Sequence, residues 1–167
     1  VPASSAAFAN GTLARAFDFD DCHEESATHT SVSVVPPALA MAERQGGITG
    51  AELITTVAVA NDLIARLSLA ACCGAGPGDG LFAPSMLYGT FGAAAAAGRV
   101  LGLDEAQMVD ALSIALTRTA GSMQYTQDNG AYHINFGFLC QVGVLAALMA
   151  NNGIYFTRHV FQGKQGL

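Results

Sequence analysis

The chain has 167 residues, of which 51% are hydrophobic and only 12% are charged. A chain of this length forms one domain, and its apolar content excludes an intrinsically disordered protein. Seven Lys and Arg against thirteen Asp and Glu give a net charge of −6, which excludes a nucleic-acid-binding protein because phosphates repel such a chain. So few charges predict that part of the surface is buried against another domain or subunit.

The cysteine content and the hydropathy of the chain indicate in which cellular compartment the protein is expected. Four cysteines, two of them adjacent, do not make a disulfide framework, so we expect a protein of the reducing cytoplasm. The longest uncharged stretch, residues 131–157, contains several polar side chains, and residues 81–98 are interrupted by Pro84 and glycines. A membrane span needs about 20 apolar residues, so we expect no transmembrane helix and no membrane partner.

The first two predicted helices are marked by their ends. Residues 33–46 form the first, with Pro36 and Pro37 near its first turn, where a missing N–H is harmless, and glycines at its end. Thr49 and Glu52 match a capping box. This box opens a second helix to about residue 71, whose apolar residues recur at helical spacing and bury one face.

A glycine-rich segment, residues 72–84, is predicted to be a loop, and it lacks the Lys and Ser or Thr of a phosphate-binding loop. The next helix, residues 89–98, consists mostly of Gly and Ala and so has almost no side chain on any face. Small residues let neighbouring backbones approach closely, so we predict that this is the central buried helix. Replacing Ala95 by Leu is then expected to overpack it by about 1–3 kcal/mol.

The remaining elements are also helical. Asp104 begins a second capping box and a helix to about residue 120, residues 121–132 are a polar loop, and residues 136–151 are another buried helix. No segment shows a convincing strand pattern apart from the short run at residues 31–35. The sequence therefore predicts an all-α fold of five or six helices without an internal domain boundary.

Polar side chains concentrate in residues 18–29, DFDDCHEESATH. Three interpretations are open: a solvated acidic turn, a metal site, and a general acid/base site in which carboxylates position a His. The metal interpretation is weakened because the Asp, Cys and His side chains lack a paired ligand frame. The other histidines, His133 at a loop-to-helix junction and His159 near the chain end, are expected to be structural.

The run NGTLARAFDFDDCHEESATHTSVSVVPPALAMAE resembles the signature of the MmgE/PrpD family, whose members carry Asn-Gly-Thr, Asp-Phe-Asp-Asp-Thr and His-Pro-Ser before a Pro-Ala-rich helix. The runs GTFGAAAAAGRVLGLDEAQMVDALSIA and GVLAALMANNGI look like the same family in the same order, so the resemblance covers residues 1–167. It implies part of an all-helical domain from a protein that also has a smaller α/β lid domain. That lid is absent from this chain, so we expect a homodimer or a second subunit that supplies the missing domain.

The resemblance also implies a chemistry: removal or replacement of a group next to a carboxylate, without metal, iron–sulfur cluster or other cofactor. Asp18 matches the family's active-site Asp, His29 matches the His of His-Pro-Ser, and Cys22 stands where many members have an active-site Thr. A pocket can open where the chain is not helical, as in the glycine-rich loop and the polar loop. We therefore expect Asp18 and His29 to face one cleft beside residues 80–86 and 121–135.

Three positions depart from the family pattern. Ala83 stands where a catalytic His is expected, Tyr132 where a Lys is expected, and Asn135 where a second His is expected. The family's usual tricarboxylate-type substrate therefore does not follow from the resemblance.

Two functions remain open. The first is a metal-independent lyase (dehydratase or decarboxylase) or isomerase that acts next to a carboxylate of a small carboxylic acid. It would use Asp18 and His29, with Tyr132 or His133 in place of the lost groups. The alternative is a catalytically degenerate family member that serves as a structural or partner subunit.

Overall fold

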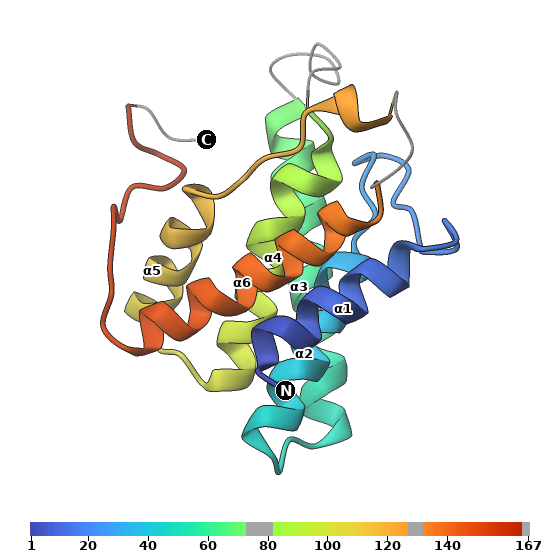
Figure 1. Cartoon of the computed structure of the whole chain (residues 1–167). Coiled ribbons are helices and arrows are strands. Elements are labelled where there is room, and N and C mark those ends of the chain that lie inside the picture. Colours follow the sequence, from blue (N-terminus) through green and yellow to red (C-terminus); the bar gives the residue numbers. More distant parts are fainter. Residues whose placement is uncertain (73–81, 127–131, 165–167) are drawn as a thin grey trace.

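A computed structural model describes residues 1–72, 82–126 and 132–164, and these contain six α-helices, one short 3-10 helix and no strand (Figure 1). The elements are α1 (Ala3–Arg15), α2 (Ser31–Gln45), α3 (Gly50–Cys72), α4 (Pro84–Leu101), α5 (Glu105–Leu116), η1 (Met123–Thr126) and α6 (Ile134–Asn151). The predicted all-α fold is confirmed. Most of the predicted glycine-rich loop, residues 72–84, lies outside the described residues.

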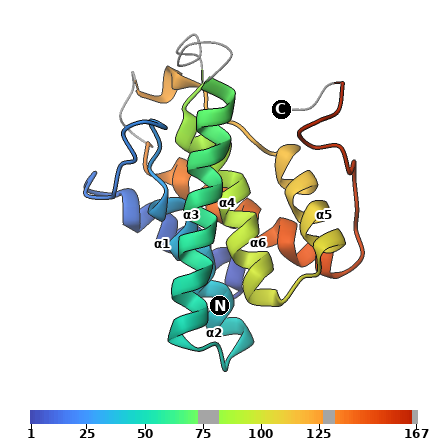
Figure 2. The same cartoon turned by 180° about the vertical axis from the view of Figure 1, so that it is seen from behind.

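Helix α4 lies at the centre of the fold. It packs against α2, α3, α5 and α6, while α1 packs on α2 and α6 (Figures 1 and 2). Thirteen of its eighteen residues are buried, which confirms the prediction that the glycine- and alanine-rich helix is central.

Close backbone contact explains why this helix has such small side chains. A Cβ on Gly143 of α6 would lie 2.3 Å from Ala93 Cβ and 2.6 Å from the Ala93 carbonyl carbon. Ala95 is different, because it is only half-buried and lines a groove of about 690 Å³ between α3, α4 and α5. The groove therefore argues against the expectation that Leu at position 95 overpacks the helix, since that side chain would meet a groove and not a helix backbone.

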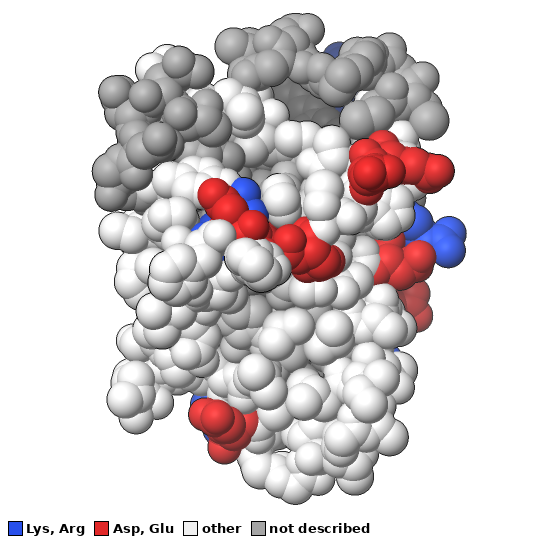
Figure 3. Space-filling model, turned by 90° about the vertical axis from the view of Figure 1, so that its right-hand side faces the viewer, with Lys and Arg blue, Asp and Glu red and all other residues white. Residues whose placement is uncertain are grey.

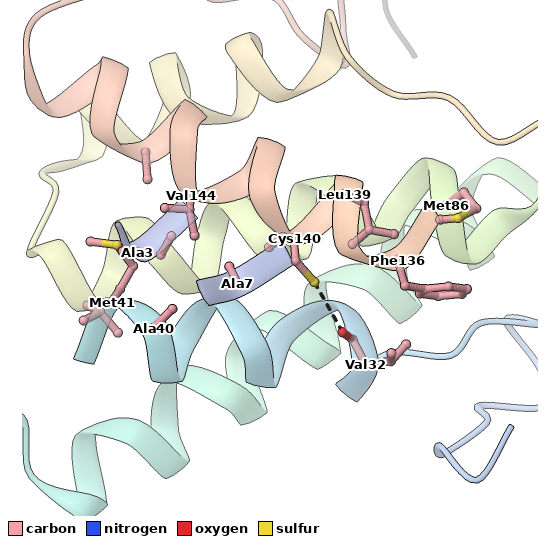
Figure 4. Close-up of a cluster of buried hydrophobic side chains, with 14 of the residues drawn as sticks. Ala3, Ala7, Val32, Ala40, Met41, Met86, Phe136, Leu139, Cys140 and Val144 are labelled. Atoms are coloured by element: carbon pink, nitrogen blue, oxygen red, sulfur yellow. Dashed lines mark hydrogen bonds between the residues drawn. The ribbon is translucent and has the colours of Figure 1, made fainter. Parts of the chain in front are cut away.

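Helix α2 also differs from its prediction. It begins at Ser31, so Pro36 and Pro37 are its sixth and seventh residues, beyond the first turn. A proline has no N–H to donate to the carbonyl four residues earlier, which leaves the Val32 and Ser33 carbonyls without their helical donors. The thiol of Cys140 on α6 lies 3.4 Å from the Val32 carbonyl oxygen, to which it donates (Figure 4), and 3.9 Å from the Ser33 carbonyl oxygen. The single proton of a side chain on another helix thus partly replaces the two missing donors.

Both predicted capping boxes are present. The Glu52 N–H donates to Thr49 Oγ1 at 3.2 Å, and the Thr49 N–H and hydroxyl donate to Glu52 Oε2 at 2.8 and 2.7 Å. These bonds lower the pKa of Glu52 because they stabilise its charged form. Asp104 and Gln107 make the same reciprocal pair at the start of α5.

Two helices are long and apolar enough to cross a membrane by length and composition alone, Gly50–Ala71 of α3 and Ile134–Asn151 of α6. Core helices of folded domains meet the same two criteria, so the expectation of no transmembrane helix stays a prediction. Half of the α6 segment is buried inside the fold, as in the core helix of a folded domain, against 28% of the α3 segment. The outer face of α3 leaves Ile54 and Val59 exposed, and among the described residues nothing covers it.

Candidate functional site

Three connectors meet at one end of the helical bundle. They are the segment between α1 and α2, the start of α4, and the described residues just before η1 and just before α6 (Figure 1). The His29 N–H donates to Ser85 Oγ at 2.9 Å, and the Ala83 N–H donates to the Gly121 carbonyl at 2.8 Å. The described parts of residues 80–86 and 121–135 therefore do lie beside His29.

Arg15, the last residue of α1, links these connectors through its guanidinium group. It is 6% exposed; its Nε donates to Tyr132 Oη at 2.8 Å, its Nη1 donates to Asp20 Oδ1, and its Nη2 lies 3.0 Å from Asp18 Oδ1. The guanidinium carbon also lies 5.1 Å from the ring centroids of Tyr132 and Phe136. Burial by itself would lower the pKa of Arg15, but the hydrogen bonds to Tyr132 and Asp20 outweigh it and the pKa is raised.

Sequence reasoning missed Arg15, although one signal pointed to it: it is the sole charged residue of α1. Its partner Tyr132 stays a neutral phenol, because burial raises the Tyr132 pKa more than the nearby guanidinium lowers it. A buried charge needs partners of this kind to offset its desolvation.

One ring nitrogen of His29 contacts the group formed by Arg15, Tyr132, Asp18 and Asp20, here called the Arg15 cluster. Its Nδ1 is 3.0 Å from the Asp21 carbonyl oxygen, 3.3 Å from Asp20 Oδ2 and 3.3 Å from Arg15 Nη1. Its side chain is 30% exposed, and within the described part of the chain its Nε2 makes no hydrogen bond. The imidazole is therefore held at Nδ1, and its Nε2 is unbonded within residues 1–72, 82–126 and 132–164.

The two acids next to Arg15 differ in burial. The side chain of Asp20 is 6% exposed, and its Oδ2 accepts no hydrogen bond from the described residues. The side chain of Asp18 is 60% exposed, and the residue has a positive φ of 52°. The carboxylate beside His29 thus belongs to Asp20. Asp18, the residue named from the family resemblance, is exposed to solvent and contacts Arg15.

Hydrogen bonds hold the connector that carries His29 in place. Asp21 accepts from the Thr30 hydroxyl at 2.8 Å and from the Ser31 N–H at 3.1 Å, so it caps α2 from outside the helix. Buried Ser26 is 2.6 Å from the Thr28 hydroxyl, and its carbonyl accepts from Ser68 of α3 at 2.7 Å. The connector is therefore attached to both α2 and α3.

The other two predicted site residues are placed differently. Cys22 is an exposed free thiol, with no hydrogen bond to the Arg15 cluster among the described residues. His133 precedes α6, its ring lies edge-on to Tyr132 with centroids 5.0 Å apart, and its buried Nδ1 has no partner in the part of the chain that is described. No group of three or more His, Cys, Asp or Glu in those same residues is arranged to hold a metal ion.

The positions that depart from the family pattern are also at this end of the bundle. Ala83 is buried at the N-cap of α4. Asn135 lines a cavity of about 260 Å³ together with Arg118 and Thr90. Neither this cavity nor the groove beside α3 is lined by His29, so the cleft expected to hold His29 and Asp18 stays a prediction.

Charged side chains are sparse elsewhere. On the side of the molecule that carries the connector between α1 and α2, acidic side chains form a few separate patches with some basic atoms beside them, and most of the remaining described surface is uncharged (Figure 3). Apart from the Arg15 cluster, the one ion pair among the described residues is the exposed pair of Arg66 and Asp62.

Comparison with known proteins agrees with the fold. The family model described as MmgE/PrpD N-terminal domain matches residues 1–167. Human cis-aconitate decarboxylase is 31% identical over 99% of this chain and 34% of its own length. The cis-aconitate decarboxylase of Aspergillus terreus is 28% identical over 97% of this chain and 34% of its own length, so the chain spans about a third of these relatives. The chain belongs to the MmgE/PrpD family.

Proposed function

We propose that this chain provides the acid/base part of the active site of an MmgE/PrpD-family lyase or isomerase that acts next to a carboxylate of a small carboxylic acid. One observation carries the proposal: His29 Nδ1 lies against the Asp21 carbonyl and the buried Asp20 side chain, while its Nε2 makes no hydrogen bond to any described residue. Such an arrangement suits a proton acceptor and donor. Relatives named cis-aconitate decarboxylase support the lyase class.

The chemistry that His29 would perform is a proton transfer at the carbon next to the substrate carboxylate. In a dehydration, Nε2 takes the proton from that carbon, and the hydroxyl group of the neighbouring carbon takes up a proton and leaves as water. In an epimerisation, Nε2 takes the proton and the carbon is reprotonated on its opposite face. In a decarboxylation the carbon–carbon bond breaks, CO₂ leaves, and His29 in its imidazolium form gives the Nε2 proton to the carbon that keeps the electron pair. The neutral Tyr132 hydroxyl, polarised by Arg15, is a candidate donor to developing negative charge.

The charge of the site indicates what the rest of the protein must supply. Asp18, Asp20 and Asp21 against Arg15 give a net charge of about −2 when His29 is neutral, and a carboxylate substrate is repelled by such a charge. No other Lys or Arg of the described residues forms an ion pair with this cluster. We therefore expect the substrate-holding cations to come from a second subunit, as in a homodimer, or from a further domain.

A second candidate function has a specific observation in its favour. Ala83 and Tyr132 stand where the family resemblance implies a catalytic His and a Lys, and Asn135 stands where it implies another His. A subunit that has lost these groups could serve a structural or partner role in the cytoplasm.

The two candidates are separated by one experiment. The full-length protein is incubated in deuterium oxide with a panel of hydroxy and unsaturated carboxylic acids, and deuterium incorporation or product is followed by NMR. The enzyme proposal predicts exchange or turnover of at least one acid, without added metal. No exchange with any acid, from a folded protein, would favour the structural subunit.

A further inference from the structure

The contacts of His29 Nδ1 determine which ring nitrogen carries the proton. Two acceptors face this nitrogen: the Asp21 carbonyl at 3.0 Å and Asp20 Oδ2 at 3.3 Å. Asp20 Oδ2 is buried and accepts no hydrogen bond from any described residue, so it has a lone pair directed at no other donor. A buried carboxylate oxygen without a donor is costly, and the imidazole N–H is the nearest group able to relieve it.

One contact opposes this arrangement. Arg15 Nη1 is a donor, and it also lies 3.3 Å from His29 Nδ1. Nη1 carries two N–H groups: one donates to Asp20 Oδ1, and the second faces His29. Two acceptors against one donor at Nδ1 favour a protonated Nδ1.

We propose that Asp20 is a positioning residue for His29: it keeps the proton on Nδ1 and so leaves Nε2 as the nitrogen that exchanges protons with the substrate. The claim rests on the proposed function, because it specifies how the acid/base of that site is oriented. Nothing in the family resemblance assigned this role to Asp20, since the resemblance pointed to Asp18. The ionised side chains around the ring are Asp20 and Asp21 of its own connector, Arg15 of α1 and, across Arg15, Asp18.

Arg15 completes the arrangement from the other side of Asp20. Its hydrogen bond to Oδ1 holds the Asp20 carboxylate in place. When Nε2 takes a proton, the imidazolium charge appears 3.3 Å from Oδ2, which is the oxygen without another donor. The carboxylate can then stabilise that charge without moving, as a preorganised group.

The test is a measurement of the His29 tautomer, which needs no substrate. Full-length protein labelled with ¹⁵N in its histidine rings is studied by NMR above the pH at which the ring is charged. The proposal predicts a protonated Nδ1 and a bare Nε2 for His29. A predominantly Nε2–H tautomer in the unmutated protein would overturn it, whatever the variants show.

Asp20→Asn provides the second readout. Its amide can donate to Nδ1, so the variant is expected to move the proton to Nε2 and to lower kcat by roughly 10²–10⁴-fold with little change in KM. Asp18→Asn is the matched control for the tautomer. It also removes one negative charge next to Arg15, but the Asp18 side chain makes no described contact with His29. Circular dichroism checks that each variant folds. An unchanged tautomer in folded Asp20→Asn protein would refute the positioning role.

The outcomes also separate this proposal from the one on which it rests. A protonated Nδ1 that is lost in Asp20→Asn, in a protein that turns over no acid, would support the Asp20–His29 contact and refute the proposed function. If turnover depends on His29 but the tautomer is unchanged in Asp20→Asn, the proposed function is supported and the positioning role of Asp20 is refuted.

Discussion

Two alanines on the central helix test how closely α4 and α6 pack. Ala93 is fully buried, and its Cβ lies only 2.3 Å from the position that a Cβ on Gly143 would take. Ala95 lies two residues further on and lines the groove of about 690 Å³. Leu and Ala have similar helix propensities, so the same substitution at the two positions compares packing alone.

The expected magnitudes follow from these surroundings. The three added carbons in Ala93→Leu must enter the space of the α6 backbone, so overpacking should lower the free energy of unfolding by about 1–3 kcal/mol or more. In Ala95→Leu the same carbons lie over an open groove and leave water only in part. With about 0.8 kcal/mol for each fully buried CH₂, the change should lie between zero and about 1 kcal/mol of stabilisation.

Urea unfolding of both variants and the unmutated protein, followed by circular dichroism, measures this difference. A loss of stability of about 1–3 kcal/mol would be a large fraction of the 5–15 kcal/mol that is typical of a folded domain. Equal stability of the two variants, or a less stable Ala95→Leu protein, would refute the contact between α4 and α6 described above.

Further predictions concern the buried thiol and a helix cap. Burial raises the pKa of Cys140, so peptide mapping after brief alkylation should find Cys140 unmodified in folded protein and the exposed Cys22 modified. The folded state keeps the Cys140 proton while the unfolded state releases it from roughly pH 8.5, so the free energy of unfolding should fall as pH rises further, by up to about 1.4 kcal/mol per pH unit. Cys140→Ala should reduce that slope, and an identical slope would contradict the assignment. Asp104→Ala should cost about 1 kcal/mol in urea unfolding because it removes the α5 cap.

The helices could be predicted from the sequence because their signals are local. Capping boxes at Thr49 and Asp104 depend on residues three apart, and the small side chains of residues 89–98 depend on composition alone. The position of the prolines in α2 could not be predicted in the same way. A proline inside a helix normally costs about 3 kcal/mol, and the Cys140 thiol that supplies the missing donor is more than a hundred residues away.

The candidate site shows the same division. The motif resemblance identified His29 as a site residue, but the partner of its ring depends on the path of the connector. The positive φ of Asp18 and the hydrogen bonds of Asp21 to the start of α2 place Asp20, and not Asp18, against the imidazole. Arg15 and Tyr132 are 117 residues apart, and only the packing of α1 against α6 brings them together.

The most direct test of the account is the turnover of full-length protein with His29→Gln, measured on any acid that the unmutated protein converts. The account predicts a loss of at least about 10²-fold in kcat, which is the lower end for a general acid/base. His159→Gln is the matched control, since that side chain is exposed and far from the Arg15 cluster in the sequence, and it should leave turnover unchanged. Full turnover by the folded His29→Gln protein would contradict the assignment of His29 as the acid/base.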